Sequence, residues 1–157
     1  MALFLSTYLN KLDKKGRISV PASYRATLSQ EGYSGFIAFR SYKFPAIECC
    51  SFSRMEQMSK SVDQLDIFSE AQDDFSAAIF ADAEQIPFDG DGRIILPKAL
   101  VTFAEIEDTA AFVGRGATFQ IWHPDRFEAH QNKARERIHE RQATLKLAPG
   151  SLHEDRS

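Results

Sequence analysis

Residues 13–21, DKKGRISVP, return later in the chain as residues 89–97, DGDGRIILP. The Asp, Gly, Arg, Ile and Pro residues recur in register, which indicates a duplicated supersecondary unit rather than a chance similarity. The chain is 157 residues long, a size at which two small halves can share one hydrophobic core. We therefore predict two repeats, residues 1–80 and residues 81–147.

The sequence around each motif predicts the same order of elements. Each proline opens a short helical pattern, residues 21–28 and 97–104, at the first helical position, where its missing N–H group costs nothing. Apolar strand-like runs follow at residues 36–39 and 47–49, and again at 111–114 and 119–122. Because neither repeat has enough strands to close a stable sheet alone, we expect a mainly β, α+β fold in which two pseudo-symmetric halves share one barrel-like core.

Further helices are predicted after the strands of each repeat. Ser53 and Glu56 form a capping-box pattern, and apolar residues at helical spacing within residues 67–79 predict a stripe that packs against the core. Pro124 opens a segment that runs to about residue 146, whose mixed charges are more typical of a solvated helix than of a second DNA contact. Residues 148–157 offer little to bury, so a disordered tail is expected there.

The charges are unevenly distributed along the chain. The net charge is −3, yet residues 1–55 carry eight Lys or Arg against three acids, and residues 56–91 carry one against ten. No apolar run approaches the roughly 18 residues of a membrane span, and no secretion signal is recognisable, so we expect a cytoplasmic protein without a membrane partner. Cys49 and Cys50 are adjacent, which favours buried free thiols over a strained disulfide.

The first copy of the motif has the chemistry of a DNA-binding loop. Gly16, one residue before the arginine, suits a backbone position with positive φ, as an ordinary hairpin turn would also require. Unlike an ordinary turn, this loop places Lys14, Lys15 and Arg17 around the single acid Asp13. An arginine fork can pair bidentately with guanine edges or phosphate, a carboxylate across the turn can hold that fork, and lysines beside it can neutralise phosphates.

The second copy keeps the Asp-to-Arg spacing but changes the charge between them. Gly90 and Asp91 stand where the first loop has its lysines, so the second loop is locally acidic. Two carboxylates, on Asp89 and Asp91, repel phosphate, and we expect Arg93 to play a lesser part than its counterpart in the first loop. The candidate DNA-binding residues are Asp13, Lys14, Lys15, Gly16, Arg17, Asp89 and Arg93.

Three segments resemble the MraZ family of transcriptional regulators: FLSTY at residues 4–8, LDKKGRISVP at 12–21 and IWHPDRF at 121–127. The family's Asp-x-x-x-Arg motif occurs twice, at residues 13–17 and 89–93, and only the C-terminal tail falls outside the resemblance. The resemblance implies an AbrB/MazE/MraZ-like swapped-hairpin double-split β-barrel that assembles into a ring homo-oligomer. It also implies binding of double-stranded DNA at short direct repeats upstream of the cell-division and cell-wall gene cluster, the protein's own promoter included, and association with the nucleoid.

Other functional classes receive less support from the sequence. The four histidines lack paired metal spacing, the residues from 89 onward lack calcium-loop ligands, and nucleophile-elbow, P-loop and dinucleotide motifs are missing. We therefore expect no metal, no cofactor, no small-molecule ligand and no enzymatic activity. The alternative that stays open is a protein-binding, antitoxin-like or scaffold module on the same barrel, with the loops serving as turns and the acidic middle segment contacting a basic partner.

Overall fold

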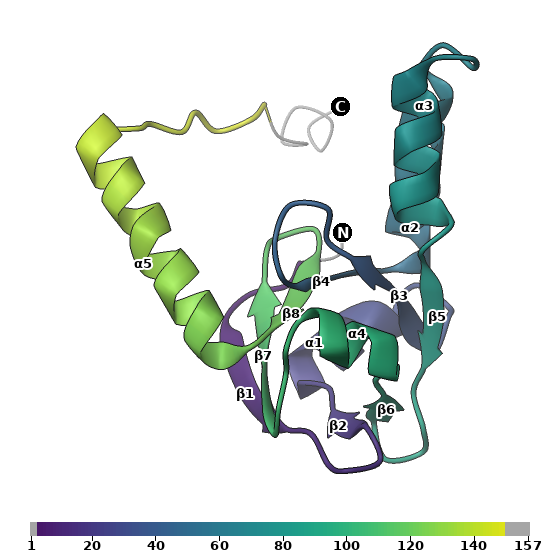
Figure 1. Cartoon of the computed structure of the whole chain (residues 1–157), viewed down its shortest axis with the longest axis vertical. Helices are drawn as coiled ribbons and strands as arrows, with labels where there is room; N and C mark the ends of the chain where they lie inside the picture. Colours follow the sequence, from purple (N-terminus) through teal and green to yellow (C-terminus); the bar gives the residue numbers. More distant parts are fainter. Residues whose placement is uncertain (1–2, 150–157) are drawn as a thin grey trace, which may run out of the picture. The chain divides into compact units, whose positions relative to one another are not determined.

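The computed structural model describes residues 3–149 and is a mixed α+β structure with an antiparallel sheet (Figure 1). The chain divides into two compact units, residues 1–127 and residues 128–157. The strands of the first unit are β1 (Thr7–Lys11), β2 (Arg17–Ser19), β3 (Gly35–Arg40), β4 (Ile47–Cys50), β5 (Glu84–Pro87), β6 (Arg93–Ile95), β7 (Thr109–Gly114) and β8 (Phe119–Trp122). Its helices are α1 (Ala22–Ser29), α2 (Phe52–Asp63), α3 (Glu70–Phe75), the π-helical turn η1 (Ser76–Phe80) and α4 (Lys98–Phe103), while α5 (Pro124–Arg141) begins in it and continues into the second unit.

Strand pairing interleaves the two repeats. The six-stranded sheet has the order β1-β7-β8-β4-β3-β5, and β2 and β6 form a separate two-stranded sheet. The first strand of each repeat pairs with the third strand of the other, β1 with β7 and β5 with β3, and β4 pairs with β8 across the middle. Neither repeat closes a sheet by itself, so the expected shared α+β architecture is confirmed and is consistent with an AbrB-like barrel.

The larger of two buried hydrophobic clusters is filled by side chains from both repeats. Phe119 lies at its centre, with ring centroids 4.9 Å from Phe4, 5.0 Å from Tyr24 and 5.1 Å from Phe36. Tyr24 comes from α1, and its hydroxyl donates a hydrogen bond of 2.7 Å to the carbonyl of Ser6, so this buried polar group is satisfied. Each aromatic side chain buried in this way contributes about 1.5–3 kcal/mol from the hydrophobic effect, which makes the core the main source of stability for the loops it supports.

The two short sheet strands are anchored to that core by one residue each. Ile18 of β2 and Ile94 of β6 face each other in the antiparallel register and are both 1% exposed. Their neighbours on the strands alternate outward, as the period of two in a β-strand requires. Because these strands follow the two motif loops directly, the core fixes the base of both loops.

Two sequence expectations for α2 and α3 were wrong in detail. The N-cap of α2 is Ser51, whose hydroxyl accepts from the N–H of Arg54, because β4 ends at Cys50 and leaves Ser51 in extended geometry. Ser53 lies inside the helix and donates to Glu31 instead. The apolar stripe within residues 67–79 is only partly packed: Ile79 is buried, but Ile67 and Phe68 precede α3 and are 66% and 92% exposed.

Several remaining features bear on function. Cys49 and Cys50 are buried free thiols, as expected.

The charged C-terminal helix ends at Arg141, earlier than the expected residue 146, and most of the expected disordered tail, from residue 150 on, lies outside the described residues. Within residues 3–149, no helix has the length and apolar character that crossing a bilayer requires, and no three His, Cys, Asp or Glu side chains cluster in a way that could hold a metal ion.

Candidate nucleic-acid interface

The loop between β1 and β2 is organised around the carboxylate of Asp13. One carboxylate oxygen accepts the backbone N–H groups of Lys15 at 2.9 Å and Arg17 at 2.8 Å. The other accepts Nε of Arg17 at 2.7 Å, so one side chain fixes both the backbone turn and the direction of the guanidinium. Gly16 has φ +82°, a left-handed conformation that glycine adopts without strain.

The loop between β5 and β6 repeats this geometry. Asp89 accepts the N–H groups of Asp91 at 2.8 Å and Arg93 at 2.9 Å on one oxygen, and Nε of Arg93 at 3.1 Å on the other. Gly92 takes the place of Gly16, with φ +74°. The second loop adds one contact that the first does not have, from Nη2 of Arg93 to Asp91 at 3.3 Å. The repeated sequence spacing therefore encodes a repeated hydrogen-bond pattern.

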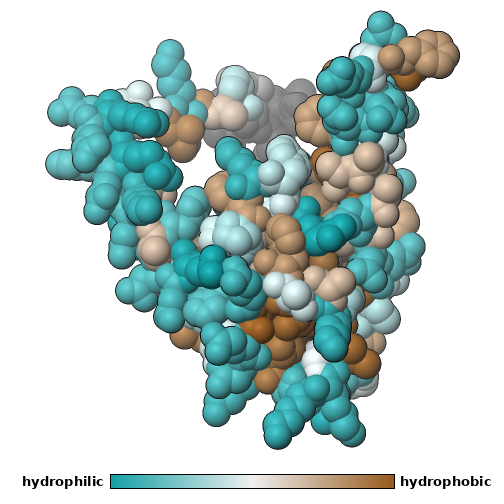
Figure 2. All heavy atoms as spheres, viewed as in Figure 1, coloured by the Kyte–Doolittle hydropathy of each residue, from teal (hydrophilic) through white to brown (hydrophobic). Residues whose placement is uncertain are grey.

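Reciprocal backbone hydrogen bonds tie each loop to the other repeat. The N–H of Leu96 donates to the carbonyl of Gly16 at 2.7 Å, and the N–H of Val20 donates to the carbonyl of Gly92 at 3.2 Å. Figure 1 shows both loops at the same end of the first unit, the end opposite α2 and α3, and Figure 2 shows hydrophilic residues gathered there. The two loops therefore form one hydrogen-bonded two-loop surface.

The two loop aspartates at this surface stay ionised, and the two loop arginines stay accessible to solvent. The pKa of Asp13 is lowered, first by the hydrogen bond from the backbone N–H of Arg17 and then by those from the Arg17 side chain and the N–H of Lys15. Desolvation acts in the opposite direction and raises this pKa, but by less than the hydrogen bonds lower it. The pKa of Asp89 is lowered in the same way, first by the backbone N–H of Arg93. The Arg17 and Arg93 side chains are 39% and 36% exposed, so neither guanidinium is sealed away from solvent by its ion pair.

The structure brings each candidate aspartate together with its arginine, and the two loops differ as their sequences do. Lys14 and Lys15 are exposed at the first tip, next to Arg17, which gives that tip a positive balance. Asp91, with a side chain 79% exposed, stands at the corresponding part of the second tip. The roles of these residues in DNA binding stay predictions.

One residue near the second loop was not predicted. Arg25 extends from α1 and donates from Nε to the carbonyl of Val20 at 3.1 Å. Its guanidinium lies so close to the second loop that a Cβ on Gly92 would come within 2.7 Å of its Cζ. The sequence places this arginine in a helix of the first repeat, so only the interleaved fold shows that it belongs beside the second loop.

Comparison with known proteins agrees with the repeat and its loops. The family model described as "MraZ protein, putative antitoxin-like" matches residues 3–42 and 79–148, which include both loops. A protein named Transcriptional regulator MraZ from Rickettsia akari (strain Hartford) is 47% identical over 148 residues, covering 94% of this chain and 99% of its own length. Proteins of the same name from Rickettsia felis (strain ATCC VR-1525 / URRWXCal2) and Rickettsia rickettsii (strain Sheila Smith) are 46% and 47% identical over the same shares of both chains. The chain therefore belongs to the MraZ family.

Proposed function

We propose that this protein is a DNA-binding transcriptional regulator that contacts duplex DNA through the two Asp-x-x-x-Arg loops. The observation that carries the proposal is the pair of matching loops, residues 13–17 and 89–93, which place two half-exposed arginines on one hydrogen-bonded surface. The relatives named as transcriptional regulators, which match nearly the whole chain, support the same function. The units that carry the loops are the proposed repeats, residues 1–80 and 81–147.

The first loop supplies the stronger contact in this proposal. Asp13 holds Nε of Arg17, so the guanidinium is oriented before DNA arrives and loses less side-chain entropy on binding. A guanidinium presented in this way can donate to the O6 and N7 atoms of guanine in the major groove. Lys14 and Lys15 add contacts to phosphates, which raise affinity without reading sequence. Arg93 makes a weaker contact because Asp91 shares its guanidinium.

Binding to repeated sites requires several copies of the chain. A single two-loop surface makes few base contacts, whereas copies held in one assembly gain avidity when DNA repeats match their spacing. Exposed apolar side chains could support such assembly: β1 is an edge strand of the six-stranded sheet, Leu9 on it is 61% exposed, and Leu5, just before it, is 59% exposed. We propose a ring homo-oligomer in the cytoplasm, associated with the nucleoid, that binds short direct repeats upstream of the cell-division and cell-wall genes and its own gene.

A footprint on the DNA upstream of the protein's own gene tests this function. We expect wild-type protein to protect repeated short segments, and Arg17→Ala to lose that protection while keeping its fold and its oligomer size. The matched control is Arg40→Ala, because Arg40 is also an exposed arginine paired with an aspartate, Asp82 at 2.6 Å, but lies on β3. Unchanged protection by Arg17→Ala, or equal loss in the control, would contradict the role given to the loop.

The alternative function is a protein-binding, antitoxin-like module. It is favoured by one specific feature, the exposed Ile67 and Phe68 between α2 and α3, which lie within the acidic stretch 56–91. Figure 2 shows hydrophobic atoms at the far end of the α2–α3 hairpin. A basic partner with an apolar groove would fit these exposed residues. Isolation of the protein from its native host decides between the two: a stoichiometric protein partner, together with DNA binding that is lost at physiological salt, would favour the alternative.

A further inference from the structure

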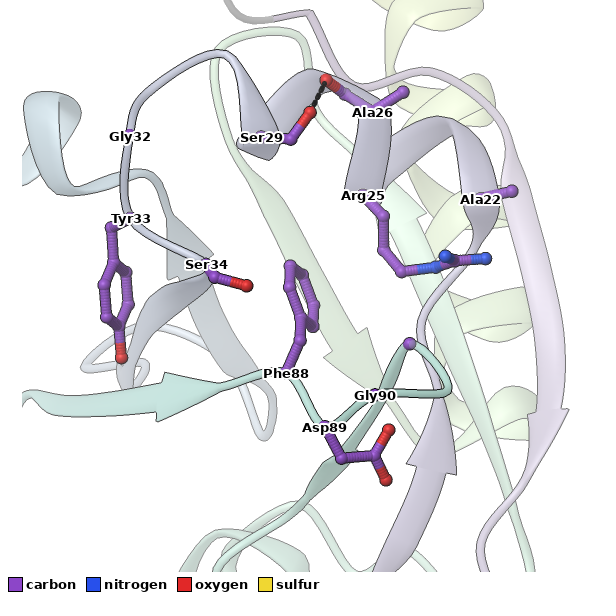
Figure 3. Close-up of a pocket in the computed structure, with 11 residues that line it drawn as sticks. Ala22, Arg25, Ala26, Ser29, Gly32, Tyr33, Ser34, Phe88, Asp89 and Gly90 are labelled. Atoms are coloured by element: carbon purple, nitrogen blue, oxygen red, sulfur yellow. Dashed lines mark hydrogen bonds between the residues drawn. The ribbon is translucent and has the colours of Figure 1, made fainter.

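A cleft of about 480 Å³ opens between α1 and the second loop. Its lining includes Arg25 and Ser29 from α1, Ser34 from the segment before β3, and Asp89, Gly90 and Gly92 from the loop. In Figure 3 the Arg25 side chain reaches from α1 toward the loop that carries Asp89 and Gly90. The cleft is therefore a polar hollow beside the candidate DNA-binding surface, with a guanidinium in its wall.

The guanidinium of Arg25 is held in place but not neutralised. Its Nε donates to the carbonyl of Val20, and no carboxylate lies within ion-pair distance of it in the described part of the chain. Gly92 lets the guanidinium lie against the loop, since any side chain there would collide with it. The terminal N–H groups of a guanidinium whose Nε is already bonded are donors suited to a tetrahedral oxyanion.

This arginine restores a charge that the second loop lacks. The first loop carries its own lysines, whereas Asp89 and Asp91 outnumber the one basic residue of the second, Arg93. The position of Arg25 in the first repeat corresponds to Val101 in the second, so α4 has no cation at the equivalent position. The interleaved fold therefore supplies a second cation beside this loop from the helix of the other repeat.

We propose that this cleft binds a backbone phosphate of duplex DNA, with Arg25 as the phosphate-binding cation of the second loop. The proposal rests on the DNA-binding function proposed above and extends it to a residue outside both motifs. The exposed carboxylate of Asp91, which contacts Arg93, repels phosphate. The phosphate therefore approaches the loop from the side of α1. The positive charges of Arg25 and Arg93 balance the negative charges of Asp89 and Asp91. The phosphate contact at the second loop is therefore weaker than the lysine-rich contact at the first loop.

The test measures DNA affinity at several salt concentrations for three variants. Arg25→Gln removes the charge, Arg25→Lys keeps it, and Lys60→Gln removes one charge from the exposed face of α2 as a matched control. We expect Arg25→Gln to weaken binding about tenfold on every sequence and to flatten the slope of log K against log salt by about one for each engaged protomer. Arg25→Lys should keep the slope, and Lys60→Gln should match the wild type.

A purely structural role for Arg25 predicts a different result. Loss of the bond to Val20 would lower the melting temperature of both Arg25 variants, but Arg25→Gln would then keep the wild-type salt slope, which would overturn the proposal. If wild-type protein binds no duplex, the proposed function itself fails. If it binds and Arg25→Gln behaves like Lys60→Gln, only the cleft proposal fails.

Hydrogen exchange on the wild-type protein provides a measurement that no folding defect can affect. We expect duplex DNA to protect the peptides that contain α1 and residues 88–92, and inorganic phosphate at the same concentration to leave them unchanged. Protection by inorganic phosphate without protection by DNA would mean that the cleft takes a small free phosphate, and would overturn the proposal. Exchange that DNA leaves unaltered at both segments would overturn it as well.

Discussion

A methyl group added at Gly92 tests the contact between the second loop and the helix of the other repeat. Gly92→Ala introduces two separate penalties. The residue has φ +74°, where an L-amino acid is strained, and its new Cβ would stand 2.7 Å from the guanidinium of Arg25. The far end of a flexible side chain can move, so we expect Arg25 to rotate away and lose its bond to the carbonyl of Val20.

The size of the effect follows from these two contributions. The left-handed conformation costs roughly 1–2 kcal/mol, from which about 0.4–1 kcal/mol is recovered because alanine has less freedom than glycine in the unfolded chain. The lost hydrogen bond adds about 1 kcal/mol. We therefore expect Gly92→Ala to lower the free energy of unfolding by about 2 kcal/mol, and only by about 1 kcal/mol when Arg25 is already alanine.

Urea unfolding followed by Trp122 fluorescence measures this difference. Trp122 is the only tryptophan in the sequence, is 1% exposed and packs in a second buried cluster with Ala46, Ala111 and Val113, so its emission reports unfolding of the first unit. At fixed protein concentration, Gly92→Ala should shift the midpoint by about 1 M urea if the m-value is near 2 kcal/mol/M. In the double-mutant cycle with Arg25→Ala the coupling should be about 1 kcal/mol. Gly16→Ala is the control, because its Cβ would meet the carbonyl of Leu96 at 3.1 Å rather than Arg25, and it should add to Arg25→Ala without coupling.

Additive behaviour of Gly92→Ala and Arg25→Ala would refute the placement of the guanidinium against the second loop. The same result would remove the geometric basis for a phosphate site in the cleft, whatever its effect on DNA affinity. Coupling of equal size between Gly16→Ala and Arg25→Ala would point to a general loosening of the barrel, and would refute the specific contact just as clearly.

Two further predictions concern ionisable groups. Asp13 and Asp89 have lowered pKa values when folded, so their contribution to stability is complete above the ordinary value of 3.8 and is lost as pH falls through the lower folded values. Urea midpoints recorded between about pH 5 and pH 3 should therefore fall less steeply for Asp13→Asn and Asp89→Asn than for wild type, and parallel curves would contradict the hydrogen-bond pattern. Burial raises the pKa of Cys50 to about 12 and that of Cys49 well above its usual range, so native protein should react with a thiol reagent at neutral pH far more slowly than unfolded protein. Rapid labelling of either thiol in folded protein would show that the strand carrying them opens readily.

The repeat explains why much of the fold could be predicted from the sequence. Two copies of one pattern support each other in a way that a single short strand cannot, and the structure places Ile18 and Ile94, which occupy matching positions in the two copies, inward and opposite each other. The loop geometry was also predictable in part, because a glycine one residue before the arginine and an aspartate four residues before it leave few turn conformations. The same local information encodes the Asp13–Arg17 contact.

Features that depend on distant residues could not be predicted. Ser51 and Ser53 both precede helix-forming residues, and the choice of Ser51 as the cap depends on where β4 ends and on Glu31, which engages Ser53 from another element. The apolar residues 67 and 68 fit a helical stripe in the sequence, yet the chain turns into α3 only at Ser69. Periodicity reports which residues could share a face, but not whether another element covers that face.

The interleaved pairing has a consequence for how the two loops can differ. The carbonyl of each loop glycine accepts a hydrogen bond from an N–H of the other repeat, Gly16 from Leu96 and Gly92 from Val20, so the base of each loop is fixed by residues that do not belong to its own motif. A charge can then be supplied to a loop from the neighbouring repeat without changing the loop itself, as Arg25 illustrates beside Gly92. Under the proposed function, the replacement of Lys14 and Lys15 by Gly90 and Asp91 therefore leaves the second loop within the DNA-binding surface. The relevant charge is that of the joined surface, and a motif examined alone underestimates it.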